Sequence, residues 1–261
     1  KLFRIIALKD FGFMKKGELG GLIEKESNLS QKNECWIHEN ASVTGNAKVT
    51  GNAKVYGNAQ VSGDAEVTGN AKVYENALVT GKAEVRGDAE VTGNAKVYGN
   101  AKVYSTAYVS GNALVSGDAR VTGNAEIYGN AKVSGNALVS GYALVSGYAK
   151  VYGDAKVYGN ASVTGNAQVI DKSKVYGNAT VYNTAYVSGN AKATKEVITF
   201  GNIFDYDITI TDNHIKIGCQ QYLKSRWLEF TNKEILEMEG KKALKFWGLF
   251  KPFAINMGFF N

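Results

Sequence analysis

The stretch Val55-Tyr56-Gly57-Asn58-Ala59-Gln60-Val61 contains the six-residue unit that decides the fold of this chain. Val or Ile recurs at every sixth position from Ile37 to Val187, which makes 26 units without a change of phase. Four positions after each of these residues stands a small residue, which is Ala in every unit except the one with Ser173. A fixed short period of this kind predicts a solenoid, in which similar units stack on one another.

Strand alternation predicts which residues of the unit face inward. Residues two apart in a strand point to the same side, so Ala59 and Val61 face the interior and Gln60 faces solvent. The pair Gly57-Asn58 consists of residue types that tolerate positive φ, which allows a sharp corner after each short strand. Three such units close a triangular coil of 18 residues. One coil cannot offset the entropy of ordering its backbone, so the coils must stack and share a continuous core.

Repeats such as Val67-Thr68-Gly69-Asn70-Ala71-Lys72 resemble the hexapeptide repeat of left-handed β-helix proteins, over residues 37 to 192. The left hand of the coil is implied by this resemblance. The Gly-Asn-Ala-x-Val pattern also resembles solenoids of bacteria and phages with unassigned activity. In these, a segment like Leu19-Gly20-Gly21-Leu22-Ile23 precedes the repeats, and one like Ile215-Lys216-Ile217-Gly218-Cys219 with Trp227 follows them. The expected fold is an all-β solenoid, a left-handed parallel β-helix with a small α+β C-terminal cap.

We predict three segments, which are an N-terminal cap with an irregular first coil (1–36), the β-helix (37–194) and an α+β C-terminal domain (195–261). The N-terminal segment should contain a strand from Phe3 to Leu8 and a first coil built on apolar residues, namely Leu19, Leu22, Ile23 and Leu29. Cys35 occupies an inward position of the repeat, so we expect a small core residue there rather than a reactive thiol.

The C-terminal segment departs from the repeat and predicts both strands and helices. Val197 to Phe200 and Ile208 to Ile217 alternate like strands, the latter around a turn at Asp212-Asn213-His214. A capping box, Thr231 to Glu234, should open a helix that Gly240 ends, and Lys242 to Phe250 should form a second. Six aromatic residues predict a separate core: Trp227, Phe230, Phe246, Trp247, Phe250 and Phe253. The domain is either a lid on the solenoid or a module for recognition or oligomerisation.

Composition and charge favour a cytoplasmic protein. The segment Lys1 to Lys9 is too short and too charged for a signal peptide, and no segment is apolar over the length of a membrane span. Cys35 and Cys219 share no metal-ligand or redox spacing, which favours free thiols in a reducing compartment. The net charge of +6 is modest for a dedicated DNA-binding domain. We expect no membrane association, no metal and no cofactor.

The residues also argue against an enzyme. Resemblance to the family implies an acyltransferase with a His general base, or a zinc site with three His, but the chain has only His38 and His214. His38 is the single histidine of the solenoid, and a surface side chain beside a strand explains it more simply. Glu66 and Glu84 occupy equivalent positions on adjacent coils, yet the flanking lysines indicate a face of mixed charge. A hexapeptide-type acyltransferase that uses His38 stays as the alternative.

Sorting outward residues by their position within 18 residues separates the three faces of the solenoid. One face carries cations and tyrosines without an acid in its second half: Lys102, Tyr104, Arg120, Lys156, Tyr158, Lys174, Tyr176 and Lys192. Such a face suits an acidic protein surface or a nucleic-acid backbone with stacked bases. The simpler alternative, which we weigh more heavily, is a solvated face whose long side chains cover the corners.

A second candidate surface is apolar and consists of Leu138, Tyr142, Leu144 and Tyr148, where both tyrosines replace the usual corner Asn or Asp. An interface with another subunit or a partner and scattered surface side chains explain it equally well. By resemblance alone, β-helices of this kind commonly form homo-oligomers. The prediction from the sequence is therefore a non-catalytic binding or structural rod. A protein is the favoured partner and nucleic acid the alternative, and resemblance suggests a phage-type inhibitor of a host protein.

Overall fold

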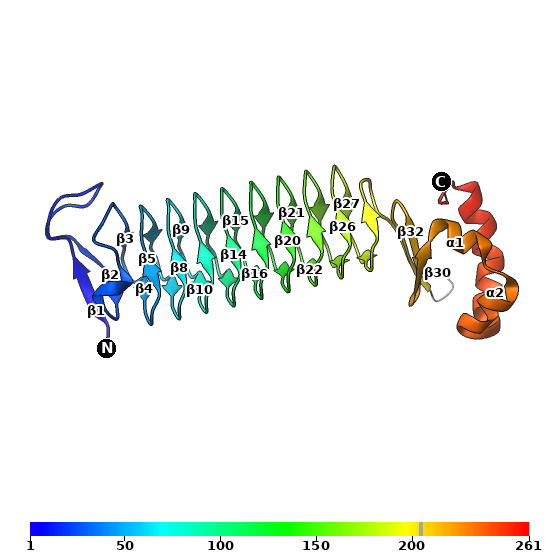
Figure 1. Cartoon of the computed structure of the whole chain (residues 1–261), viewed down its shortest axis with the longest axis horizontal. Coiled ribbons are helices and arrows are strands. Elements are labelled where there is room, and N and C mark those ends of the chain that lie inside the picture. Colours follow the sequence, from blue (N-terminus) through cyan, green and yellow to red (C-terminus); the bar gives the residue numbers. More distant parts are fainter. Residues whose placement is uncertain (204–205, 261) are drawn as a thin grey trace.

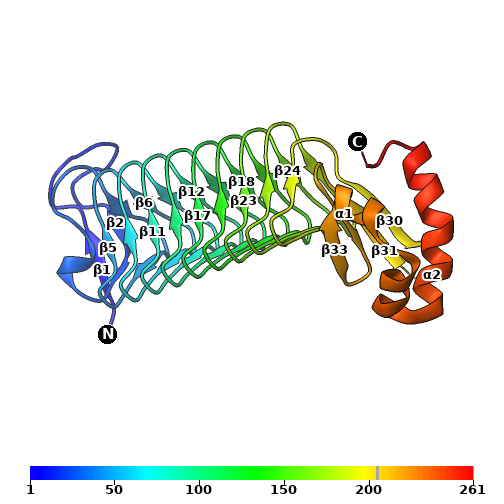
Figure 2. The same cartoon turned by 45° about the vertical axis from the view of Figure 1, so that its right-hand side comes forward.

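The computed structural model describes residues 1–203 and 206–260 and shows a rod of stacked coils with a small sheet and helices at one end (Figures 1 and 2). The chain enters at the end of the rod that holds β1 (Phe3–Ile6) and leaves it through the helices at the other end. Each coil contributes one short strand to each of three sheets, so the rod has three sides.

In each of the three sheets the strands of successive coils are hydrogen-bonded neighbours, and they are given below in that spatial order. The first sheet contains β1, β2 (Leu19–Ile23), β4 (Ser42–Val43), β7 (Gln60–Val61), β10 (Leu78–Val79), β13 (Lys96–Val97), β16 (Leu114–Val115), β19 (Lys132–Val133), β22 (Lys150–Val151), β25 (Gln168–Val169) and β28 (Tyr186–Val187). The second contains β5 (Lys48–Val49), β8 (Glu66–Val67), β11 (Glu84–Val85), β14 (Lys102–Val103), β17 (Arg120–Val121), β20 (Leu138–Val139), β23 (Lys156–Val157), β26 (Lys174–Val175) and β29 (Lys192–Ala193). The third contains β3 (Trp36–Ile37), β6 (Lys54–Val55), β9 (Lys72–Val73), β12 (Glu90–Val91), β15 (Tyr108–Val109), β18 (Glu126–Ile127), β21 (Leu144–Val145), β24 (Ser162–Val163) and β27 (Thr180–Val181).

The register confirms the 18-residue coil. Leu78 lies opposite Lys96, which lies opposite Leu114, and the strands of neighbouring coils run parallel. The inward Val and Ala side chains have no exposed surface along the rod, as Val115 and Ala113 illustrate. The predicted parallel β-helix and its inward residues are therefore confirmed.

The corners show why glycine follows most strands. Gly93 and its equivalents have positive φ, and a Cβ at Gly93 would approach the backbone of the next coil to 2.8 Å. A few corners hold an acidic residue at positive φ instead, such as Glu75 and Asp171. The Glu75 carboxylate accepts a hydrogen bond from the Gly93 N–H (2.8 Å), and Asp171 accepts one from the Gly189 N–H (2.9 Å). These side-chain bonds offset part of the conformational cost of a non-glycine residue at a corner.

The N-terminal cap continues the first sheet and covers one end of the rod. β1 pairs antiparallel with β2, and the 3₁₀ helix η1 (Glu26–Asn28) leads into the first regular coil. The buried Trp36 ring packs edge-on against the Phe11 ring, with a centroid distance of 5.4 Å. Cys35 is buried, as predicted. Two expectations are wrong, because the strand ends at Ile6, and Leu19 is 66% exposed rather than part of the coil's core.

The C-terminal domain is an antiparallel sheet with helices against it. The sheet contains β30 (Ile198–Ile203), β31 (Tyr206–Ile210), β32 (His214–Ile217) and β33 (Gln220–Leu223), and the helices are α1 (Lys224–Glu229) and α2 (Asn232–Asn256). Thr231 caps α2 as predicted, and the helix breaks at Glu239 and Gly240. The sequence did not predict β33 or α1. Phe253 is 44% exposed and lies at the edge of the aromatic core, where its ring contacts those of Phe250 and Phe259.

The C-terminal domain satisfies backbone groups that the last coil would otherwise expose. The Asp212 N–H donates to the Lys192 carbonyl (3.0 Å), and an Asp212 carboxylate oxygen accepts from the Thr194 N–H (2.7 Å). The Val197 N–H donates to the Thr180 carbonyl (2.8 Å). An open sheet edge would be a template for pairing with other chains. The domain thus covers the end of the solenoid, and this role is compatible with a further role in recognition or oligomerisation.

Candidate binding face

The second sheet carries all the cations and tyrosines that the sequence assigned to one face. Direct register pairs join Lys102 to Arg120, Leu138 to Lys156, and Lys174 to Lys192 across neighbouring strands. Tyr104, Tyr158 and Tyr176 follow β14, β23 and β26 at the next outward position. The 18-residue spacing therefore places these side chains on one side of the rod.

Three consecutive lysines form the strongest feature of this face, and we call Lys156, Lys174 and Lys192 the lysine row. They lie on β23, β26 and β29, which are adjacent strands in register. Neighbouring strands are about 4.8 Å apart, so the row spans about 10 Å. All three side chains are exposed, and within the described residues none of them forms an ion pair. Like charges opposite one another in a sheet disfavour the fold slightly.

Two stacked tyrosines lie beside the lysine row. The Tyr158 and Tyr176 rings are nearly parallel, at 5° and a centroid distance of 5.0 Å. Partial burial in this stack, together with the neighbouring Tyr176, raises the pKa of Tyr158 above its ordinary value. The pair presents a flat aromatic surface next to a line of positive charge.

The other end of this face is neutralised by an acid from its first half, so Lys102 is not free of acidic neighbours as expected for the second half. Glu84 on β11 forms ion pairs with both Lys102 and Arg86. The Arg86 guanidinium also lies 5.1 Å from the centre of the Tyr104 ring. Lys102 and Tyr104 therefore already have partners within the chain, and the part of the face available for binding begins at Arg120.

Acidic residues also border the lysine row at the corner between the first and second sheets. Asp154 precedes Lys156 by two residues and accepts a hydrogen bond from the Asn136 amide (2.9 Å). Asp171 holds the Gly189 N–H as described above. Neither forms an ion pair with the row among the described residues. These acids reduce the net charge of the area without occupying the face itself.

Two cations of the C-terminal domain that the sequence did not assign lie near Lys192. The side-chain oxygen of Asn213 accepts from the Lys192 N–H (2.9 Å), and the Asn213 carbonyl accepts from the Lys224 N–H (3.0 Å). Burial lowers the pKa of Lys224, Asp212 opposes this shift, and the charge of Lys195 adds to it. Lys195 and Lys224 thus lie near the end of the row. No sequence signal indicates this, because the domain lacks the 18-residue period.

The four apolar residues of the second candidate surface do not form one flat patch. Leu138 lies on the second sheet and Leu144 on the third. Tyr142 and Tyr148 occupy the corners after these two strands and are 68% and 62% exposed. The side chains therefore follow the chain around the rod, and a single planar interface cannot cover all four.

His38 lies beside a small pocket. It borders a cavity of about 30 Å³ beneath the N-terminal cap, together with Trp36 and Lys54, and this space corresponds to about one water molecule. Burial, with a contribution from Lys54, lowers the pKa of His38, so the imidazole is neutral at pH 7. In residues 1–203 and 206–260 no cluster of metal-binding side chains is found. The helices of this part of the chain do not combine the length and apolar character of a membrane span.

Comparison with known proteins bears on the solenoid. A family model described as the YdcK beta solenoid repeat matches residues 131–147, which run from the strand β19 to the corner after β21. The search of curated proteins returned no match. Together, the repeat match and the stacked parallel coils identify the chain as a β-helix repeat protein.

Proposed function

We propose that this protein is a non-catalytic rod that binds an acidic protein partner through the lysine row and the adjoining part of the C-terminal domain. The observation that carries the proposal is the in-register run of Lys156, Lys174 and Lys192 without ion-pair partners among the described residues. An acidic partner would relieve the repulsion within the row, and the Tyr158–Tyr176 stack would add contact area with little loss of side-chain freedom.

The dimensions of the row favour a protein over a nucleic acid. Three lysines over about 10 Å, with Arg120 beyond Leu138, can neutralise few phosphates, whereas a protein that binds DNA tightly at low salt can contact about six to ten. Asp154 and Asp171 along the bordering corner would repel a phosphate backbone. Acidic side chains of a protein can be placed between these fixed charges, which is how complementary interfaces gain specificity.

We also propose a more specific class for this protein. The Gly-Asn-Ala-x-Val pattern and the segments that flank the repeats support a bacterial or phage solenoid of the cytoplasm whose partner is a host protein. Affinity capture with the full chain, followed by mass spectrometry, should recover an acidic protein. Capture that yields no protein dependent on the lysine row would contradict this assignment.

Reversing two charges of the row should weaken partner binding. In the variant Lys156→Glu with Lys174→Glu, we expect the affinity for the captured partner to fall at least tenfold at low salt and its salt dependence to flatten. The melting temperature should stay nearly unchanged because exposed charges contribute little to folding. Titration calorimetry at several salt concentrations measures both effects.

The chain offers a matched control for this experiment. Lys132 and Lys150 are also exposed and in register on adjacent strands, but they lie on the first sheet. The variant Lys132→Glu with Lys150→Glu makes the same change of charge on another side of the rod and should keep wild-type affinity. Equal loss in both variants would show that net charge, not the lysine row, attracts the partner.

The acyltransferase alternative predicts the opposite behaviour in an activity assay. We expect no turnover with acyl-CoA donors and amine or hydroxyl acceptors, because the space beside His38 holds about one water. Activity that disappears in His38→Ala would overturn the non-catalytic assignment. The variant Tyr56→Phe is a control, since the Tyr56 ring packs edge-on against His38 at 6.2 Å and the substitution keeps that contact.

A further inference from the structure

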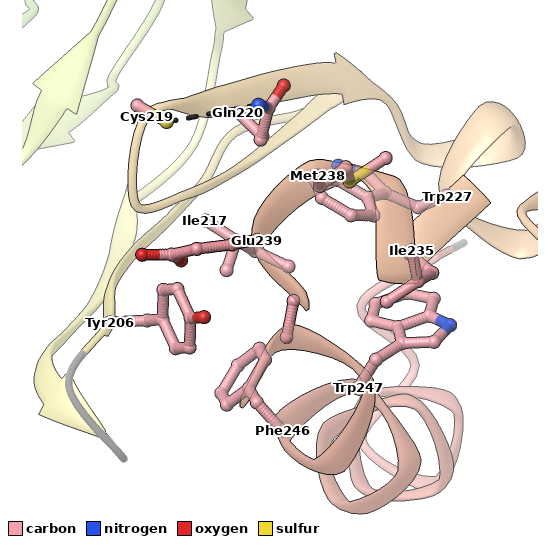
Figure 3. A pocket seen from close by; sticks show the side chains of 11 residues that line it. Tyr206, Ile217, Cys219, Gln220, Trp227, Ile235, Met238, Glu239, Phe246 and Trp247 are labelled. Atoms are coloured by element: carbon pink, nitrogen blue, oxygen red, sulfur yellow. Dashed lines mark hydrogen bonds between the residues drawn. The ribbon is translucent and has the colours of Figure 1, made fainter. Parts of the chain in front are cut away.

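The C-terminal domain contains a partly open cavity of about 150 Å³ between its sheet and its helices (Figure 3). The walls are largely apolar and include four aromatic side chains, which are Tyr206 from β31, Trp227 from α1, and Phe246 and Trp247 from α2. These four side chains belong to the buried core of the domain. The cavity is therefore part of the folded domain and is distinct from the lysine row.

A cavity of this size is large enough for a small organic molecule. Protein interiors contain few voids larger than a water molecule, and apolar cavities of about 150 Å³ can hold benzene. The Trp227 indole N–H donates to the Ile215 carbonyl (2.7 Å), so this polar atom is already satisfied. The wall at Trp227 thus offers an apolar ring surface rather than an unused donor.

The charge of the lining is acidic, although the protein as a whole is basic. Glu239 is the single charged residue among the lining residues, which include no Lys, Arg or His. The break in α2 places it there, because Gly240 adopts φ 70° and redirects the helix beside the opening. Figure 3 shows the Glu239 side chain extending toward the sheet on the side of Tyr206. Cys219 and Gln220 complete this polar end of the cavity.

The aromatic rings of this domain already attract cations from their surroundings. The Lys242 ammonium lies 5.4 Å from the centre of the Tyr206 ring, and the Lys251 ammonium lies 5.6 Å from that of Trp247. Neither lysine lines the cavity. Ring faces attract a positive charge through their quadrupole, and a nearby carboxylate strengthens the attraction.

We propose that this cavity binds a small organic cation, an amine whose apolar body is about the size of benzene. The apolar body occupies the space between Tyr206, Phe246 and the two tryptophans. The ammonium group lies at the polar end, where it donates a hydrogen bond to the Glu239 carboxylate. The proposal does not depend on the partner that the lysine row binds, so either can fail without the other.

Benzylammonium and benzyl alcohol test the proposal, because they share an apolar body and differ in charge. Titration calorimetry of the full chain should show one site for benzylammonium, and benzyl alcohol should bind at least about fivefold more weakly. Cys219 provides a second readout, since it is exposed while Cys35 is buried. Bound benzylammonium should slow alkylation of Cys219 by iodoacetamide, as mass spectrometry can measure.

Two Glu-to-Gln substitutions distinguish a specific role of Glu239 from an effect of the overall charge of the domain. Glu239→Gln should lower the affinity for benzylammonium about fivefold and leave that for benzyl alcohol unchanged. Glu237→Gln is the matched control, because Glu237 is exposed on the same helix and does not line the cavity. Ala243→Leu should fill the space and abolish binding of both compounds, with the circular dichroism spectrum confirming the fold.

Several outcomes would overturn the proposal. They are the absence of both heat and Cys219 protection at millimolar benzylammonium, equal binding of the two compounds, and equal affinity of the Glu239 and Glu237 variants. Undiminished binding by a folded Ala243→Leu variant would place the compound elsewhere on the protein.

Discussion

The variant Val115→Asp should lose the cooperative fold of the solenoid. Val115 lies on β16 in register with Val97 and Val133 and has no exposed surface. A buried carboxylate without a partner costs several kcal/mol, and two neighbouring coils lose packing at the same site. Because each coil depends on its neighbours, we expect the free energy of unfolding to fall by about 4 kcal/mol or more. Thermal unfolding followed by circular dichroism should show a melting temperature lower by about 10 °C or more.

The conservative change at the same position is the control. Ile37 and Ile127 already occupy equivalent inward positions without exposed surface, so a coil accommodates the extra methylene group. Val115→Ile should therefore change the free energy of unfolding by about 1 kcal/mol or less. If Val115→Asp melts like the parent protein, the inward assignment of this position is wrong.

The variant Gly21→Ala should detach the N-terminal cap from the rod. A Cβ at Gly21 would lie 2.4 Å from both the Ala41 carbonyl oxygen and the Ile37 Cγ2 atom. The Ala41 carbonyl also accepts the Leu22 N–H (2.8 Å), a hydrogen bond that joins β2 to the next coil. Relieving the clash moves this carbonyl and breaks the bond, which should cost about 2–3 kcal/mol. Hydrogen exchange should show lost protection in β2 together with a lower melting temperature.

A Gly-to-Ala substitution at a position without close neighbours is the control for the clash at Gly21. Gly248 lies on an exposed part of α2, and a Cβ there would meet no atom within 4 Å. Gly248→Ala should raise the stability of the helix by up to about 1 kcal/mol, because alanine favours helix more than glycine does. If the amides of β2 exchange as slowly in Gly21→Ala as in the wild type, the cap accommodates the added Cβ without losing its contacts, and the prediction is wrong.

The repeat was predictable from the sequence because its physical causes are local. The side-chain alternation of a strand assigned Val115 and Ala113 to the interior, and both are fully buried. The glycine corners have the positive φ that their residue type favours. The capping box at Thr231 and the stop at Gly240 are equally local, and both occur in α2. Leu19 was misassigned because the irregular first coil follows no period.

The binding face was predictable in part. The 18-residue spacing brings Lys156, Lys174 and Lys192 together, since identical coils repeat their side chains in register. The same spacing places Glu84 in one column with Lys102, and only the side-chain positions show that the two form an ion pair. The apolar residues were close in sequence, yet a corner separates Leu138 from Leu144 onto different sheets. Proximity along the chain is therefore a poor guide to a surface in a solenoid.

The sequence by itself determined the coil, its inward residues and the order of cations along one side, because a strict period turns chain position into spatial position. Only the tertiary structure decided where the aperiodic ends lie. It brought Lys224 to the lysine row through Asn213, and it formed the cavity beside Glu239 between a sheet and a broken helix. These contacts join segments that no repeat relates. They depend on how the aromatic side chains of a small domain pack together. The spacing along the chain assigns positions to the Val and Ala of the coils, but it assigns none to these aromatic residues.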